Sequence, residues 1–171
     1  ADILGTIYKQ YLGNIIKKTD NRAKITENHA HRKEQGIYYT PTYIVKYIVE
    51  STLGELLKEK KVNVEKVKVL DPACGSGSFL IKTFDFLNDY YQKISKDYSQ
   101  TQLDLETGIP FKTKSRILQN NIFGVDLDKQ AVEITQLNLL LKIAEKGHRL
   151  PILEENIKRG NSLIDSEEIV G

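Results

Sequence analysis

The chain has 171 residues, of which 40% are hydrophobic and 28% are charged, and its net charge is +2 at pH 7. This length and composition suit one domain of ordinary size with its own hydrophobic core. No apolar run approaches ~18 residues, which excludes a membrane-spanning helix. The charge is compatible with a nucleic-acid partner but does not indicate one, because basic and acidic residues are interspersed.

The cysteine content and the two ends of the chain indicate where the protein is located and whether the sequence is complete. The single Cys74 cannot form an internal disulfide, and no basic-then-apolar leader opens the sequence. Both features predict a cytoplasmic protein. The sequence contains no methionine and ends without a closing pattern, so we interpret it as part of a larger protein.

The chain opens with a predicted helix followed by a polar loop. Apolar residues recur at helical spacing between Ile3 and Ile16. Residues 17–35 are polar and charged, which predicts a loop. His29 and His31 lie in this loop, and we interpret them as surface residues because no further metal ligands stand nearby.

A second helix is predicted to begin at Pro41, with Thr40 as its cap. The run from Val67 to Leu70 predicts a short strand, and another helix is expected from about Ser78 to Ile94. The apolar face expected on the helix after Pro41 comprises Ile44, Val45, Ile48, Val49, Leu53, Leu56 and Leu57.

The second half of the chain continues the alternation of helices and strands. Residues 95–119 are predicted to form a polar, irregular connection, and Ile122 to Val125 a second strand. Asp128 is expected to cap a helix that runs to about Glu145, and a third strand is expected from Ile157 to Arg159. The order predicts an α/β fold with a parallel sheet and right-handed crossovers. The buried candidates on the helix after Asp128 are Ala131, Val132, Thr135, Leu139 and Ile143.

A glycine-rich turn, Asp71-Pro72-Ala73-Cys74-Gly75-Ser76-Gly77-Ser78-Phe79-Leu80, follows the first strand of the predicted sheet. Ligands of open parallel sheets bind beyond the carboxyl ends of the strands, and Gly75 and Gly77 let the backbone approach a ligand closely. The turn lacks the Gly-Lys-Ser/Thr of a P-loop, and Leu80 occupies the place of the third glycine of a dinucleotide fingerprint. S-adenosylmethionine, which carries no phosphate, is the ligand class that remains, with Asp71 placed for its amino group or its ribose.

Three more residues near this turn carry specific predictions. Asp126 ends the second strand, where an acidic side chain accepts hydrogen bonds from ribose hydroxyls. Asp128 is interpreted as a helix cap. Cys74 is interpreted as a small side chain that fills a tight space, since no histidine lies close to it in sequence.

Together these segments resemble the N6-adenine DNA methyltransferases of restriction-modification systems, above all the type I modification subunits and the fused type IIG enzymes. Residues 36–41 resemble the family's motif X, residues 71–80 motif I, residues 124–128 motif II and residues 160–163 motif III. The resemblance implies a partial Rossmann-like S-adenosylmethionine-dependent methyltransferase fold. Residues 1–35 would form an N-terminal helical extension, and residues 36–171 the cofactor-binding half of the methyltransferase domain.

The resemblance also implies which residues bind the cofactor. The motif X segment would hold its methionine moiety from one side and the motif I turn from the other. Asp126 would hold the ribose hydroxyls and Leu127 would pack on the adenine ring. Asn161 stands where many relatives have Asp and would accept a hydrogen bond from the adenine amine, aided by Ser162. The implied cofactor-binding residues are Tyr38, Tyr39, Thr40, Pro41, Asp71, Pro72, Ala73, Gly75, Ser76, Gly77, Phe79, Asp126, Leu127, Asn161 and Ser162.

The family's catalytic signature, Asn/Asp-Pro-Pro-Tyr/Phe, is absent, because the four prolines are Pro41, Pro72, Pro110 and Pro151. We therefore assign no catalytic residue and no metal ligand, and we predict that the chain alone is inactive. The resemblance implies double-stranded DNA as the partner, contacted mainly by parts outside this chain. Either a separate specificity subunit or fused recognition and nuclease domains would accompany it, in a prokaryotic cytoplasm.

Three alternatives remain open at this point. The chain could belong to a methyltransferase acting on RNA or on a protein glutamine amide, to a catalytically silent methylase-like binding module, or to a dinucleotide-dependent oxidoreductase. The Gly-x-Tyr-Tyr-Thr-Pro segment at residues 36–41 and the helix that precedes it favour DNA.

Overall fold

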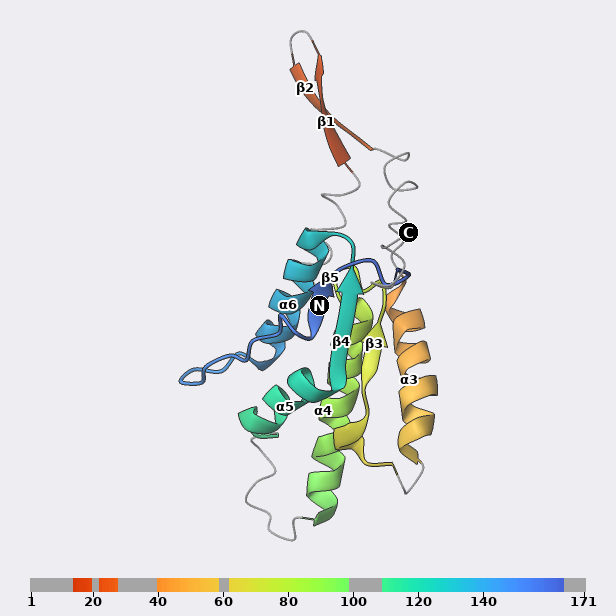
Figure 1. Ribbon diagram of the computed structural model, residues 1–171, viewed down its shortest axis with the longest axis vertical. Helices are drawn as coiled ribbons and strands as arrows, with labels where there is room; N and C mark the ends of the chain where they lie inside the picture. The colour runs from red at the N-terminus through yellow and green to blue at the C-terminus, as the bar shows by residue number, and fades with distance from the viewer. Residues whose placement is uncertain (1–13, 20–21, 28–39, 59–61, 99–108, 165–171) are drawn as a thin grey trace.

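The computed structural model describes residues 14–19, 22–27, 40–58, 62–98 and 109–164. It contains a two-stranded antiparallel hairpin and a three-stranded parallel sheet accompanied by helices (Figure 1). The elements in chain order are β1 (Asn14–Thr19), β2 (Arg22–Glu27), α3 (Thr42–Lys58), the short 3-10 helix η1 (Val64–Lys66), β3 (Val69–Asp71), α4 (Ser78–Tyr98), α5 (Phe111–Asn121), β4 (Ile122–Asp126), α6 (Lys129–Ile143) and β5 (Ile157–Arg159).

The parallel sheet has the strand order β3-β4-β5. Val69 is in register with Ile122, and Gly124 is in register with Ile157. This arrangement confirms the predicted α/β fold with a parallel sheet. Because the three strands run in the same direction, their carboxyl ends lie at one edge of the sheet.

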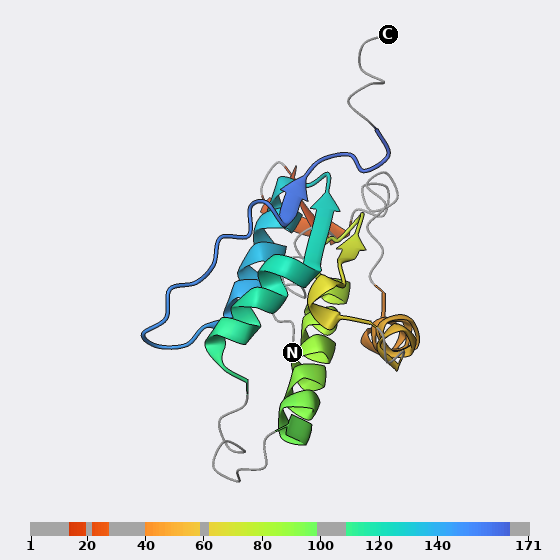
Figure 2. The same ribbon diagram turned by 60° about the horizontal axis from the view of Figure 1, so that its bottom comes forward.

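Helices α4 and α6 pack side by side on one face of the sheet, and α3 lies against the outer side of α4 (Figure 2). Parallel strands need this cover because the apolar residues on their faces must be removed from water. The largest fully buried apolar side chains among the described residues are Leu80, Leu87, Ile117, Leu118, Ile122, Leu139, Ile143 and Ile157. The core therefore lies between the sheet and the layer of helices, directly below the edge at which the strands end.

The opposite face of the sheet carries apolar side chains that the described residues leave partly in water. Leu70 is 61% exposed, whereas Phe123 and Val125 are half-buried. The Lys68 ammonium lies 5.5 Å from the centre of the Phe123 ring, a distance that suits a cation–π contact. Within the described part of the chain, β3 is also an edge strand.

The prediction of a polar loop over residues 17–35 is wrong for the residues that the structure describes. Asn14–Thr19 and Arg22–Glu27 form an antiparallel hairpin that pairs Thr19 with Arg22. The β-branched residues in these two segments favour strands. The helical spacing of Ile3 to Ile16 also fails at its end, because residues 14–16 belong to β1. The rest of that predicted helix, with His29 and His31, lies outside the described residues.

The region predicted as an irregular connection contains a helix. α5 begins at Phe111, directly after Pro110, and buries Ile117, Leu118 and Asn121. Although α5 is rich in polar residues, one of its faces is apolar and contacts the core. α4 also runs on to Tyr98, beyond the predicted end at Ile94.

The predictions for α3 and α6 agree better with the structure. α3 begins at Thr42 rather than Pro41, and the carbonyl of Pro41 accepts hydrogen bonds from the amides of Ile44 and Val45. Its buried face is narrower than predicted, because Ile48 and Leu56 remain exposed. On α6 all five predicted core residues are buried, and Asp128 caps the helix by accepting a hydrogen bond from the Gln130 amide at 2.9 Å.

Two buried asparagines join the elements below the sheet. Asn121 donates to the carbonyls of Val64 and Val67 at 2.8 and 2.6 Å and so ties η1 to the end of α5. Asn156 donates to the carbonyls of Leu118, Gln119 and Ile122, three groups at the junction between α5 and β4. Buried polar groups are costly unless paired, so these contacts hold the start of β4 in one position.

Candidate functional site

The loops that follow β3, β4 and β5 meet at one edge of the sheet. The amide of Gly75, after β3, donates to Oδ2 of Asp126 at the end of β4, at 2.8 Å. The hydroxyl of Ser162, after β5, donates to the carbonyl of Pro72 at 2.8 Å. The fold thus brings together three segments that are far apart in the sequence and that all belong to the predicted site.

The two glycines of the turn have different environments. Gly75 and Gly77 both have positive φ, +53° and +86°, which other residues adopt only with strain. A Cβ at Gly75 would meet nothing within 4 Å, so this residue faces open space. A Cβ at Gly77 would lie 2.8 Å from Cγ2 of Thr135. The first glycine therefore leaves room beside the turn, and the second allows α6 to pack closely beneath it.

Asp126 connects two loops through its carboxylate. Besides Oδ2, which accepts from Gly75, its Oδ1 accepts a hydrogen bond from the amide of Asp128 at 2.9 Å. The backbone continues this link, because the amide of Cys74 donates to the carbonyl of Val125 at 2.9 Å. Each carboxylate oxygen keeps a second lone pair, so the side chain can accept further hydrogen bonds from a ligand.

Asp71 ends β3, and its Oδ1 accepts a hydrogen bond from the amide of Ala73 at 3.1 Å. Burial raises the pKa of its carboxyl above the usual value, and the nearby Asp126 carboxylate raises it further, whereas the Ala73 amide lowers it. In the part of the chain that the structure describes, no positive charge compensates the ionised form. A cation placed beside this carboxylate would stabilise the ionised form.

The segment after β5 supplies Asn161 and Ser162, and both are exposed. Oδ1 of Asn161 accepts a hydrogen bond from the amide of Leu163 at 3.0 Å. One lone pair of the oxygen predicted to bind adenine thus already has a backbone partner, and the other stays available. Leu127, after β4, is 66% exposed and places a large apolar side chain at the same edge of the sheet.

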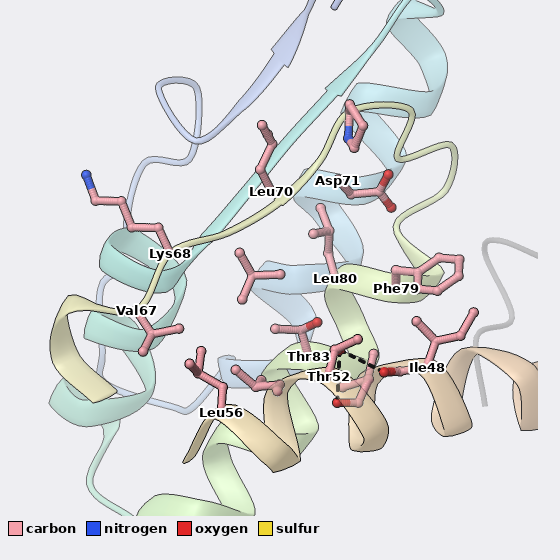
Figure 3. Close-up of a pocket in the computed structure, with 14 residues that line it drawn as sticks. Ile48, Thr52, Leu56, Val67, Lys68, Leu70, Asp71, Phe79, Leu80 and Thr83 are labelled. Atoms are coloured by element: carbon pink, nitrogen blue, oxygen red, sulfur yellow. Dashed lines mark hydrogen bonds between the residues drawn. The ribbon is translucent and has the colours of Figure 1, made fainter. Parts of the chain in front are cut away.

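A pocket of about 480 Å³ opens along β3, between α3 and α4. Three predicted site residues line it: Asp71, Pro72 and Phe79. Figure 3 shows the Asp71 carboxylate above Phe79 on one side, with Ile48 of α3 opposite Phe79. The pocket is therefore largely apolar with a carboxylate at one end, a combination typical of small-molecule sites.

The predicted motif X residues are placed only in part. Thr40 and Pro41 lie at the start of α3, and Tyr38 and Tyr39 lie outside the described residues. In Figure 1 the beginning of α3 lies toward the carboxyl ends of the strands. No hydrogen bond between Thr40 or Pro41 and the other predicted site residues is present in the described part of the structure.

Cys74 lies within the turn, with only 5% of its surface exposed. Burial, with the Asp126 and Asp71 carboxylates, raises the pKa of its thiol to about 12. The thiol therefore stays protonated at neutral pH and is a poor nucleophile. A Cβ at Gly124 would lie 3.2 Å from its sulfur, which agrees with a packing role.

The described residues include no group of three or more His, Cys, Asp or Glu side chains that could hold a metal ion. Among these residues, no helix is long and apolar enough to cross a membrane.

Comparison with known proteins identifies the family of this chain. A sequence model of the family described as N-6 DNA Methylase matches residues 1–168. The chain belongs to the N-6 DNA methylase family. This finding confirms the resemblance inferred from the motifs.

Individual relatives of this N-6 DNA methylase chain are much longer. It is 35% identical to the type II restriction enzyme and methyltransferase RM.Eco57I of Escherichia coli, covering 99% of this chain and 18% of that protein. It is 28% identical to the type I restriction enzyme MjaIX methylase subunit of Methanocaldococcus jannaschii, covering 87% of this chain and 19% of the subunit. The chain thus spans about a fifth of the length of these relatives.

A solved structure supports the fold. The chain superposes on the cryo-EM structure of a DrdV–DNA complex with a TM-score of 0.56 and 24% identity, covering 80% of this chain and 12% of that one.

Sequence reasoning missed several residues that build the site of this N-6 DNA methylase chain. Thr135 on α6 is fully buried, and its hydroxyl donates to the carbonyl of Gly75 at 2.8 Å. Asn138, one turn later, donates to the carbonyl of Ser76 at 3.3 Å. Gly124 allows close packing, because a Cβ there would lie 2.7 Å from Cδ1 of Leu80. A glycine inside a strand is a signal of such close approach, whereas the two hydroxyl and amide contacts left no signal in the sequence.

Proposed function

We propose that this chain is the S-adenosylmethionine-binding part of an adenine-specific DNA methyltransferase from a restriction-modification system, which methylates adenine at N6. The observation that carries the proposal is the position of Gly75, whose Cβ position faces open space while its amide binds the carboxylate of Asp126, and the Asp71 carboxylate of the same turn lies close enough to Asp126 for its pKa to be raised. Membership of the N-6 DNA methylase family supports this choice of cofactor and reaction.

The residues at this edge suit the chemistry of S-adenosylmethionine. The Asp71 carboxylate has no positively charged partner among the described residues, and the cofactor's ammonium group would supply one. The apolar pocket lined by Phe79 offers space for the methionine chain. The free lone pairs of Asp126 would accept hydrogen bonds from the ribose hydroxyls, and the exposed Leu127 would pack on the adenine ring.

When bound, S-adenosylmethionine supplies a methyl group already activated by its positively charged sulfur. The work of this chain is then to bind and orient the methyl donor. In this proposal the other predicted site residues surround the bound cofactor. They are Tyr38, Tyr39, Thr40, Pro41, Ala73, Ser76, Asn161 and Ser162.

The relatives of this chain support DNA as the partner. RM.Eco57I is named as a restriction enzyme and methyltransferase, and the DrdV structure is a complex with DNA. We propose that double-stranded DNA is the substrate of the intact protein, with a specificity subunit or fused recognition and nuclease domains. The target base would be flipped out of the duplex toward the methyl donor. The Asn/Asp-Pro-Pro-Tyr/Phe signature is absent from the 171 residues, so the chain alone is predicted to transfer no methyl group.

Calorimetric titration of the intact protein with S-adenosylmethionine and, separately, with NAD tests this proposal. We expect saturable binding of S-adenosylmethionine and none of NAD. Binding of NAD alone would overturn the proposal in favour of an oxidoreductase. Methyl transfer to RNA or protein but not to DNA would overturn the assigned substrate.

The affinity for S-adenosylmethionine is predicted to fall as the pH is lowered, over a range set by Asp71. The cofactor's ammonium group favours the ionised carboxylate, so binding weakens once Asp71 becomes protonated. Because the pKa of Asp71 is raised, this weakening begins at a higher pH than for an ordinary aspartate. Titrations of the intact protein at decreasing pH measure the effect.

The Asp71→Asn variant is the control for this pH dependence. Its side chain has nearly the same shape and no charge to lose, so its weaker affinity should vary little over the same pH range. An unchanged pH profile in the variant would show that another group is responsible.

A further inference from the structure

We propose that Thr135 of α6 is a positioning residue whose hydroxyl holds the glycine turn in its cofactor-binding conformation. This inference rests on the proposed function and concerns a residue outside the motifs that the sequence indicated. Thr135 is the single polar side chain among the five buried residues of α6, where its neighbours are Ala131, Val132, Leu139 and Ile143.

The contact geometry shows what Thr135 does. Its Oγ1 donates to the carbonyl of Gly75 at 2.8 Å, while the amide of the same glycine donates to Asp126 at 2.8 Å. Gly75 is therefore held at both of its backbone polar groups by side chains from two different elements. The amide of Asn138 adds a longer contact, 3.3 Å, to the next carbonyl of the turn, that of Ser76.

Gly75 needs such anchors because of its backbone freedom. Glycine populates positive and negative φ about equally, so this residue has no intrinsic preference for its φ of +53°. Its Cβ position faces open space, and no side chain of the described residues packs there to restrict the backbone. If the carbonyl were released, the turn would sample other conformations, and cofactor binding would have to restore the one that binds.

The methyl group of Thr135 has a separate role. Its Cγ2 would lie 2.8 Å from a Cβ at Gly77, so the methyl fills the space beneath the second glycine. Oγ1 also lies 2.9 Å from the same Cβ position, so both groups pack beneath Gly77, but the hydroxyl alone binds the carbonyl of Gly75. This difference makes the proposal testable, because valine keeps the branched shape without the donor and serine keeps the donor without the methyl.

The test uses the intact protein and its Thr135→Val and Thr135→Ser variants. Calorimetry measures the dissociation constant for S-adenosylmethionine, and hydrogen–deuterium exchange follows the amides of the turn without ligand. We expect roughly tenfold weaker binding for Thr135→Val, which corresponds to about 1.4 kcal/mol, and binding close to wild type for Thr135→Ser. Exchange across the turn should accelerate in the valine variant alone.

Thr113→Val is the matched control, because Thr113 lies half-buried on α5, and no hydrogen bond joins α5 to the glycine turn among the described residues. Its affinity and turn exchange should equal those of the wild type. Wild-type behaviour of Thr135→Val in both measurements would overturn the inference, as would equal losses in Thr135→Ser and Thr135→Val, which would assign the effect to packing. If the wild type binds no S-adenosylmethionine but shows the expected exchange pattern, the proposed function fails and the anchoring role of Thr135 stands.

Discussion

Replacing Gly77 with alanine is expected to destabilise the domain by about 3 kcal/mol. The positive φ of this residue costs an L-amino acid ~1–2 kcal/mol, and overpacking of a tight site adds ~1–3 kcal/mol. The new methyl group would lie 2.8 Å from Cγ2 and 2.9 Å from Oγ1 of the fully buried Thr135. α6 cannot move away easily, because its neighbouring side chains are also buried in the core. Hydrogen–deuterium exchange of α4 and α6 in the intact protein measures the loss for this domain alone.

Gly75→Ala is the matched control for this prediction. It has the same substitution and also a positive φ, but its new methyl group would meet nothing within 4 Å. We expect it to cost only about 1 kcal/mol of stability, from backbone strain. Its main effect should be weaker binding of S-adenosylmethionine, because the methyl group would project into the open space beside the turn. Equal destabilisation by the two variants would contradict the roles assigned to the two glycines.

Asp126→Asn is expected to weaken S-adenosylmethionine binding by roughly a hundredfold, which corresponds to about 2.7 kcal/mol. Both carboxylate oxygens accept backbone amides, at 2.8 Å from Gly75 and 2.9 Å from Asp128. Asparagine has one acceptor oxygen, so one of these amides would face the donating NH₂ group. The charged acceptor proposed for the ribose hydroxyls would be lost as well, and hydrogen bonds to charged groups are worth ~1.5–3 kcal/mol. Calorimetry on the intact protein measures the change.

Asp128→Asn provides the comparison two residues away. Asp128 caps α6 through the Gln130 amide, and asparagine caps helices about as well as aspartate. Its affinity for the cofactor should stay close to that of the wild type. The role of Asp126 would be refuted if Asp126→Asn bound as tightly as Asp128→Asn.

The hairpin and α5 show where local sequence patterns were insufficient. Residues 17–27 and 111–119 are both rich in polar residues, and both were predicted to lie in irregular segments. The first pairs its own two strands, and the second buries Ile117 and Leu118 against the core. A segment rich in polar residues can still form a strand through backbone pairing, or a helix through one apolar face. The overall composition of the segment reveals neither feature.

Leu70 shows a second limit. It belongs to the predicted apolar strand, yet its side chain is 61% exposed, because α4 and α6 pack on the other face of the sheet. A strand's alternation identifies two faces and does not indicate which of them is covered.

Residue types at fixed local spacing were enough to predict the parallel α/β arrangement, the glycine turn with its two flanking carboxylates, the cap at Asp128 and the family. The groups that hold the turn could be identified only from the packing of the folded chain. Asp126 accepts a hydrogen bond from the amide of Gly75, Thr135 donates one to the carbonyl of Gly75, and Gly77 leaves space for α6. These contacts join residues more than fifty positions apart, and only the packing of α6 against the sheet brings them within hydrogen-bonding distance.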